Sequence, residues 1–513
     1  MPISLSTEVL LFSLGIILCF YLARFRGPKF SYPPGPKQLP IVGNFFDLPK
    51  QRDYETYYQW SREYGSDIIY FRTLGKSTII LNSYKAATDL LERRSSIYSD
   101  RPPNVMMHDL LKYLGTAAQR YGNTWRKHRK AYRKHFDPSV IIKYRHAQTA
   151  ATQELLRRML DSPREYNAHL QYITSNLAMG IAYGMELEAN FERYVTISNK
   201  VAQIFLKIFR PGAFMVEYIP ILKYVPSWIP GAGFKTFARE ARELIGQARD
   251  IPFNDVKRRL TMGHMKESFV SNSLLDIPNT DETNEDVQVV KDVAGSIFGA
   301  GSDTTTAALE WFLLAMVMFP ETQKKAQEEL DKVIGQGRLP QFEDRSELPY
   351  IHALVKEVLR YFVITPLALP HYTTEDNVYE GYYIPAKTTI MGNSWALMHD
   401  PEEYPEPFEF NPERFLPNKE RKIQRDPFMG GAFGFGRRIC AGRHLADASI
   451  FIMAASILTV FNISKSRDEN GNEIDVTYAT IPVPNFFAHP PFFPFELKPR
   501  SEAVLRVLHD CLL

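Results

Sequence analysis

The spacing of apolar and polar residues predicts a mainly helical chain with a small β region. Residues 68–72 and 77–81 have the β-branched and aromatic bias of strands, and residues 74–76 between them predict a hairpin turn. Strand-like pieces return at residues 379–390 and again after residue 461. Both ends of the chain are therefore expected to build the β region, while the middle has the periodicity of helices.

The longest helical stretch, residues 284–319, is expected to serve a site. It contains no proline and far exceeds the average helix of about 11–12 residues, and Thr283 with Asp286 resembles an N-terminal capping box. Its centre, residues 299–306, is rich in glycine and threonine, and each glycine weakens a helix by about 1 kcal/mol. We therefore expect a local kink there. Four residues share one face of this helix: Val293, Ile297, Ala300 and Thr304.

The N-terminal segment predicts a membrane anchor. Residues 9–23 are almost wholly apolar, and Leu5 extends the run towards the ~17–25 residues that span a bilayer. Basic residues follow the run and only Glu8 precedes it, which puts the C-terminal side in the cytosol and argues against a cleaved signal peptide. The alternative is a buried core helix. The expected domains are an anchor over residues 1–26, a stiff proline-rich hinge over 27–40, and one catalytic domain over 41–513.

Composition narrows the classes of function. The chain has 513 residues, of which 45% are hydrophobic and 13% aromatic, enough for a sizeable core. Its net charge is only +3, so no overall field argues for a nucleic-acid partner. The three cysteines, Cys19, Cys440 and Cys511, build neither a disulfide framework nor a multi-cysteine zinc site.

Cys440 lies in a glycine-rich loop, residues 433–442, whose composition suits a reactive thiolate. Two arginines precede the cysteine and a helical pattern follows it. Glycines let the backbone pass close to a bound group and adopt positive φ. The N-terminal amides of the following helix would help to keep the sulfur anionic. The alternative is that Cys440 is simply a small buried hydrophobic residue.

Charged and aromatic residues recur at helical spacing in two further places. Glu357 and Arg360 are three residues apart among apolar neighbours, which favours a partly buried pair, although such pairs are weak signals alone. Arg414 could supply a third partner. Trp125 and Arg129 share a helix face. A second stripe on that helix, for which a solvated face is the simplest explanation, contains Arg126, Lys130 and Arg133.

Taken in order along nearly the whole chain, these residues resemble the cytochrome P-450 family of haem-thiolate monooxygenases. The loop matches the family signature at Phe433, Gly436, Arg438, Cys440 and Gly442. Glu357 and Arg360 match the family's Glu-x-x-Arg motif, and Arg414 matches its third charged partner. Residues 300–305 match the oxygen-activating helix motif. Trp125 and Arg129 match the helix that binds the haem propionates. The anchor and hinge resemble the microsomal members, and the chain is most similar to fungal enzymes of secondary metabolism.

The resemblance implies a P-450 fold that binds haem b and uses O2, with Cys440 as the axial ligand of the iron; a thiolate there favours O–O cleavage. The haem propionates would be held by Arg438, Arg129, Trp125 and His371. Glu357, Arg360 and Arg414 would lock the fold behind the cysteine loop. Thr304 would hydrogen-bond the oxygen that is activated, and Asp303 would feed it protons. The alternative for Thr304 is that it only caps the local kink.

The resemblance also implies partners. Because the sequence contains neither a fused reductase nor a dinucleotide fingerprint, electrons would come from a separate NADPH-dependent flavoprotein reductase. It would dock on the basic surface formed by the Arg126 stripe and four residues before the cysteine loop, Lys419, Arg421, Lys422 and Arg425. The anchor would hold the protein in the endoplasmic reticulum membrane with its catalytic domain in the cytosol.

The expected substrate pocket is chiefly apolar, which favours a lipophilic, terpenoid-like or aromatic substrate. Its residues are Val105, Met106, Phe205, Ile297, Ala300, Leu367, Leu369, Val483 and Phe486. Residues 205–230 are apolar and interrupted by prolines, so they form either a lid that touches the membrane or ordinary core.

Two other functions stay open at this stage. One is a haem-thiolate isomerase or dehydratase that inserts no oxygen, against which Asp303 and Thr304 argue. The other is a haem-binding sensor or carrier, against which the anchor and the oxygen-activating motif argue together.

Overall fold

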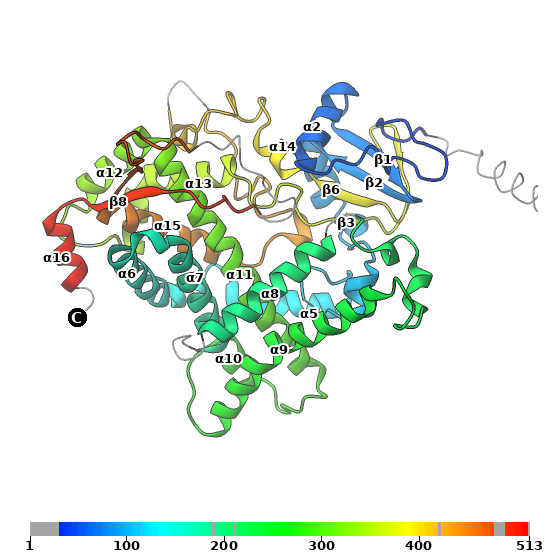
Figure 1. Ribbon diagram of the computed structural model, residues 1–513, viewed down its shortest axis with the longest axis horizontal. Coiled ribbons are helices and arrows are strands. Elements are labelled where there is room, and N and C mark those ends of the chain that lie inside the picture. The colour runs from blue at the N-terminus through cyan, green and yellow to red at the C-terminus, as the bar shows by residue number, and fades with distance from the viewer. Residues whose placement is uncertain are drawn as a thin grey trace, which may run out of the picture.

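The structure, a computed structural model, is a large helical body with a small sheet at one side, as the sequence predicts (Figure 1). It describes residues 30–113, 115–185, 191–209, 212–418, 422–476 and 488–510. The predicted anchor, residues 1–26, lies outside the described residues. Among those described, one helix, α15 (Arg443–Val460), is long and apolar enough to cross a membrane, and 72% of it is buried inside the protein.

The principal sheet joins segments from distant parts of the sequence. Its strand order is β1 (Ile68–Thr73), β2 (Lys76–Leu81), β6 (Thr389–Gly392) and β3 (His371–Tyr372). β1 and β2 are antiparallel, with Ile69 opposite Ile80, and β2 runs parallel to β6. Leu74 and Gly75 have φ of 47° and 87°, the positive values that a tight hairpin turn needs. The predicted hairpin and the joining of both chain ends are confirmed.

The remaining strands form two small antiparallel pairs, β4 (Asn377–Tyr379) with β5 (Tyr382–Ile384) and β7 (Phe461–Lys465) with β8 (Phe495–Pro499). The other α-helices are α2 (Asp53–Glu63), α3 (Tyr84–Ala87), α4 (Ser95–Tyr98), α5 (Asn123–Phe136), α6 (Arg145–Asp161), α7 (Tyr166–Tyr183), α8 (Phe191–Phe209), α9 (Gly233–Thr261), α10 (Phe269–Leu275), α11 (Glu285–Met318), α12 (Pro320–Val333), α13 (Pro349–Tyr361), α14 (Ser394–Met398) and α16 (Glu502–Asp510).

The proline-rich stretch before residue 40 is docked on the sheet and is not a free spacer. Pro34 accepts a hydrogen bond from the Tyr70 N–H at 2.9 Å, and Ser31 accepts one from Tyr383 at 2.7 Å. The Tyr32 ring stacks on Tyr70 with a centroid distance of 4.8 Å. The packed part of the protein therefore includes residues 31–34, which precede the predicted domain start at Ile41.

Helix α11 crosses the centre of the helical body and packs against α7, α5 and α15 (Figure 1). It is continuous through its glycine-rich centre. Its hydroxyls bond carbonyls one turn earlier, as between Thr304 and Ala300 at 2.8 Å, which satisfies them without interrupting the helix. Its N-cap is Asn284, whose side chain accepts the Asp286 N–H, and not the Thr283 that the sequence suggested.

Behind the cysteine loop, Glu357 forms the predicted triad with Arg360 and Arg414. The Glu357 and Arg360 side chains are completely buried. Arg360 donates to both Glu357 oxygens, at 2.7 and 2.8 Å, and Arg414 donates to Oε1 at 3.2 Å. Their remaining N–H groups donate to carbonyls of residues 398–409. The triad thus fixes the irregular segment that leads into the cysteine loop.

We predict that Arg360→Ala lowers the free energy of unfolding by about 3–5 kcal/mol, because it leaves Glu357 buried without its bidentate partner. Denaturant-induced unfolding measures the loss. The matched control is Arg338→Ala, since Arg338 also pairs with a carboxylate, Asp344, but is 43% exposed; its cost should be about 0–1 kcal/mol. Equal losses in both variants would contradict a central role for the triad.

Candidate active site

The cysteine loop is held in a tight turn that only glycine can form at one point. The Cys440 N–H donates to the Phe433 carbonyl at 2.8 Å and closes the loop. Gly436 has φ of 54°, and a Cβ there would lie 2.1 Å from the Leu91 carbonyl oxygen in η1 (Thr88–Arg93). Since such a contact is not tolerated, any other residue would push the loop away from η1. The Phe433 ring stacks on Phe428 at 5.0 Å and supports the other side.

The Cys440 thiol is a free cysteine that faces open space on one side and protein on the other. Burial by the surrounding protein raises its pKa, while the backbone N–H groups of Gly442 and Arg443 and the charges of Arg129 and Arg443 act to lower it. These groups gather where α15 begins, so the helix N-terminus and two guanidinium groups favour an anionic sulfur. A cation placed against the sulfur would add to this effect.

Beside the thiol, Arg438, Trp125 and Arg129 form one cluster, as the resemblance to the family implies. The Arg438 guanidinium lies 4.4 Å from the Trp125 ring centroid, and Arg129 donates to the Ile439 carbonyl at 2.8 Å. Arg438 donates through Nε to Ser99 and through Nη2 to Gln119. Its Nη1 is buried and has no hydrogen-bond partner among the described residues. A buried donor without a partner lowers the stability of the fold unless a ligand accepts a hydrogen bond from it.

His371 joins the same region, and so does an arginine that the sequence analysis missed. His371 donates through Nδ1 to the Tyr98 carbonyl at 2.7 Å. Burial, with the charges of Arg101 and Arg438, lowers its pKa to about 3, so the ring is neutral. Arg101 is 5% exposed and donates to the Leu369 and Pro370 carbonyls. Its one signal in the sequence was its place just before two prolines at the start of the predicted pocket.

A cavity of about 1380 Å³ opens along α11. Ala300, Asp303 and Thr304 line it, as do Phe205 and Leu369, in agreement with the predicted pocket. Cys440 and Arg438 are not among its lining residues, so the cavity and the cysteine loop are separate features of the surface. The Thr304 hydroxyl donates to the Ala300 carbonyl, which leaves its oxygen able to accept a hydrogen bond from the cavity.

Four of the predicted pocket residues do not line this cavity. Ile297 is 6% exposed and belongs to the main core, because that face of α11 packs inward and Ser296 and Gly299 line the cavity instead. The others pack in neighbouring apolar clusters: Val105, Met106 and Leu367. Val483 and Phe486 lie outside the described residues. Met107, one residue past the prediction, does line the cavity.

Comparison with known proteins identifies the family. The sequence model described as cytochrome P-450 matches residues 33–488. The chain belongs to the cytochrome P-450 family. It is 41% identical to cytochrome P-450 monooxygenase ple1 of Rhodocybe pseudopiperita over 97% of this chain and 95% of that protein. It is 38% identical to tryptamine 4-monooxygenase of Psilocybe cyanescens over 97% and 99% of the two chains. The protein is thus an oxidoreductase of a family of fungal monooxygenases.

The family implies a haem cofactor and the use of O2, and the residues around Cys440 fit a haem. The thiol is free and faces open space. A Cβ built on Gly442 would meet no atom within 4 Å, so the loop leaves room beside the sulfur. The orphan Nη1 of Arg438 has the geometry of a carboxylate donor. A planar group that carries carboxylates and takes one thiolate ligand satisfies all three observations.

We predict that Arg438→Leu releases haem, whereas its neighbour Arg437→Leu does not. Arg438 has a buried orphan donor, Nη1, while Arg437 is exposed. The measurement is haem bound per polypeptide after gel filtration, with far-ultraviolet circular dichroism to verify folding. Full haem retention in folded Arg438→Leu would contradict the assigned propionate contact.

Proposed function

We propose that this protein inserts one oxygen atom from O2 into a lipophilic small molecule, in fungal secondary metabolism, with electrons from a separate NADPH-dependent reductase. The observation that carries the proposal is the free Cys440 thiol at the start of α15, flanked by Arg129 and by the orphan donor of Arg438. This arrangement supports a thiolate-ligated haem. The family to which the chain belongs supports the reaction class.

Each residue near Cys440 has a defined task in this proposal. Cys440 is the axial ligand, and Phe433, Gly436 and Gly442 shape the loop that holds it. Arg438, Arg129 and Trp125 bind the propionates, with neutral His371 and buried Arg101 beside them. When bound, haem supplies the oxygen chemistry, and its thiolate ligand favours O–O cleavage.

On the cavity side, Thr304 and Asp303 form the path for proton transfer. The Thr304 oxygen can accept a hydrogen bond from a molecule in the cavity while its own hydrogen is held by Ala300. Asp303 lies one residue earlier on α11 and is 35% exposed in its side chain, so solvent reaches it. A carboxyl group next to a hydroxyl, both in contact with a water-accessible cavity, forms a path along which protons reach the substrate side.

The cavity lining favours an aromatic or terpenoid-like substrate. Phenylalanines from three elements line it, at positions 205, 209, 214 and 298, together with Met107 and Leu111. Such surfaces bind flat or polycyclic hydrocarbon frames. One relative is named for an indole amine, tryptamine, which has a flat aromatic frame of this kind.

The basic surface on α5 supports docking of an acidic electron donor. Arg126, Lys130 and Arg133 are exposed and make no ion pair among the described residues. Other nearby cations are already paired, Lys127 with Glu285, Lys134 with Asp276, and Arg425 with Glu403. Lys422 is exposed, while Lys419 and Arg421 lie outside the described residues. The proposed docking surface is therefore centred on α5, and Arg425 is not part of it.

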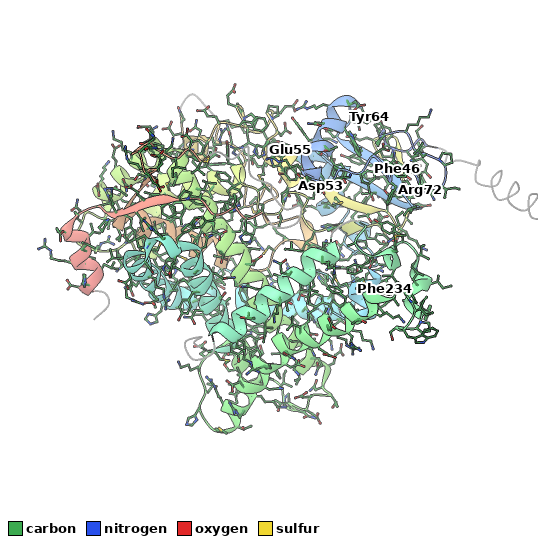
Figure 2. All side chains as sticks on the ribbon, viewed as in Figure 1. Phe46, Asp53, Glu55, Tyr64, Arg72 and Phe234 are labelled. Carbon is green, nitrogen blue, oxygen red and sulfur yellow. The ribbon has the colours of Figure 1, made fainter. Side chains whose placement is uncertain are left out.

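Exposed apolar side chains support membrane contact near the expected anchor. One group lies before the sheet, with Ile41 and Phe46 94% and 75% exposed, and another lies between α8 and α9, with Ile221 and Trp228 71% and 81% exposed. Residues 42–44 pair with 72–74, and Lys76 lies 5.4 Å from the Tyr218 ring, so both groups flank the β1–β2 hairpin. Phe46 and Phe234, at the start of α9, lie on the same side in Figure 2.

This apolar surface suits a single-pass anchor at residues 1–26 in the endoplasmic reticulum membrane, with the catalytic domain in the cytosol. The exposure of these side chains also separates the two interpretations of residues 205–230, a lid that touches the membrane and ordinary core. The stretch divides: Phe205, Phe209 and Phe214 face the cavity, whereas Ile221 and Trp228 face outward.

We predict that Thr304→Ala keeps haem but uncouples electron use from product. Loss of the hydroxyl should raise peroxide released per NADPH consumed and lower product by roughly 10²-fold, the lower end of what a proton-transfer group contributes. Thr305→Ala is the matched control, since Thr305 is the next residue but does not line the cavity. Unchanged peroxide and product in Thr304→Ala would contradict the oxygen-activating role and favour an isomerase or dehydratase.

A further inference from the structure

Two carboxylates lie on the same face of α11, and both reach the cavity. Asp303 and Glu310 are seven residues apart, which is about two helical turns, and both line the cavity, as does Thr304. The Glu310 side chain is only 8% exposed. Two anions this close in a partly buried position repel each other unless a cation joins them.

His489 is that cation. Its Nδ1 lies 2.8 Å from Glu310 Oε2 and its Nε2 lies 3.5 Å from Asp303 Oδ1. Carboxylate oxygens only accept hydrogen bonds, so the imidazole can serve both when both of its nitrogens carry hydrogen, which is the imidazolium form. Burial alone would lower the pKa of His489, but the hydrogen bonds and charges of Asp303 and Glu310 outweigh it and raise the pKa to about 10.

The backbone beside His489 is fixed, so the ring is held between the carboxylates. The Ala488 carbonyl accepts from the Trp311 indole at 2.7 Å, and the Ala488 N–H donates to Ile364 at 2.8 Å. Further along, the Phe493 N–H meets the Tyr166 hydroxyl on α7 at 3.2 Å. Burial raises the pKa of Tyr166 to about 12, so this other titratable group near Glu310 is neutral and does not compete for the imidazolium.

The wall of the cavity around these groups is polar, in contrast to the phenylalanine-lined end. His489, Asp303 and Glu310 line it together with residues of α7 and α11: Asn167, Gln171, Ser175 and Thr306. Such a surface holds water, whereas the phenylalanines favour a lipophilic molecule. The cavity therefore has a polar side and an apolar side, and Asp303 lies on the polar side next to Thr304.

We propose that His489 is a positioning residue for oxygen activation: its imidazolium, anchored by Glu310, holds the Asp303 carboxylate and orients it on the polar side of the cavity. This inference rests on the proposed role of Asp303 and Thr304. The Asp303 carboxylate accepts through its second oxygen, Oδ2, a proton that solvent delivers along cavity water, and it passes that proton on towards Thr304. The carboxylate and the water return to their starting forms, His489 keeps both of its protons, and no electrons move in this step.

The reverse direction, in which His489 itself donates the proton, is disfavoured. An imidazolium whose pKa is about 10 is a far weaker acid than a carboxylic acid, whose ordinary pKa is about 4. Proton transfer from His489 to Asp303 would therefore be unfavourable by several orders of magnitude. The fixed positive charge of His489 is what matters in this account.

A first experiment examines the pair without turnover. Histidine labelled with carbon-13 at Cε1 is followed by nuclear magnetic resonance in the reduced carbon monoxide complex, which is diamagnetic, and the His489 signal is assigned by its loss in His489→Gln. Between pH 6 and about 8.5 the wild-type signal should stay at its protonated position. In Glu310→Gln it should titrate within that range, because one anionic partner is gone. A wild-type signal that titrates with an ordinary histidine pKa would overturn the proposal.

A second experiment measures coupling and its dependence on charge. His489→Gln keeps a hydrogen-bonding side chain but loses the cation, and product per NADPH should fall roughly tenfold, the effect of losing one hydrogen bond to a charged group, with a larger solvent isotope effect. His489→Lys restores the cation and should recover most of the loss. His264→Gln, an exposed histidine beyond α9, is the matched control and should behave as wild type.

The outcomes separate this inference from the proposed function. Uncoupling in Thr304→Ala with wild-type coupling in His489→Gln would overturn the role of His489 and leave the monooxygenase assignment intact. Equal losses in His489→Gln and His489→Lys, with haem content and melting temperature retained, would show that the charge is irrelevant and would also overturn it. Wild-type coupling in all of these variants would contradict both.

Discussion

The rest of the site depends on one buried carboxylate. Glu357 is completely buried and is shared by Arg360 and Arg414, and the two guanidinium groups together bind carbonyls along residues 398–409. That segment has little regular structure of its own, so side-chain hydrogen bonds replace the ladder that a strand would provide. The same segment leads towards the cysteine loop. Just before that loop, the Gly431 carbonyl accepts a hydrogen bond from the Ser394 hydroxyl at the start of α14. The charge cluster thus fixes the segment that precedes the cysteine loop, although it makes no contact with the thiol.

From this support the molecule acquires two chemically different sides. On the loop side, burial raises the pKa of the Cys440 thiol, while guanidinium groups and the amides at the start of α15 act to lower it. On the α11 side, hydroxyl and carboxyl groups border a cavity that is polar near His489 and apolar near Phe205. In the proposed function, proton supply and substrate binding therefore use different walls of one cavity. His489 offsets one of the two negative charges that Asp303 and Glu310 bring to the cavity wall.

The sequence predicted features that depend on local spacing and missed those that depend on long-range contact. The β1–β2 hairpin, the long helix α11 and the pairs Glu357–Arg360 and Trp125–Arg129 follow from residue type at fixed intervals. Arg414 and Arg438 were expected beside these pairs because of the resemblance to the family. His489 and Arg101 were missed because their partners lie far away in the sequence: Glu310 is 179 residues from His489, and Leu369 is 268 from Arg101. Ile297 was assigned to the pocket because a helical pattern gives the face of a residue only to within one position. The proline-rich stretch before residue 40 was predicted to be a spacer, because its hydrogen bonds to Tyr70 and Tyr383 join distant parts of the sequence.

The central claim is that Cys440 is the thiolate ligand, and its most direct test is the carbon monoxide difference spectrum of the reduced protein. The three cysteines allow a matched comparison. The account predicts that wild type and the double variant Cys19→Ala/Cys511→Ala both show the red-shifted Soret band of thiolate-ligated haem. It predicts that Cys440→His, if haem is retained, gives the band of imidazole-ligated haem at shorter wavelength. A thiolate-type band in Cys440→His, or its loss in the double variant alone, would contradict the account.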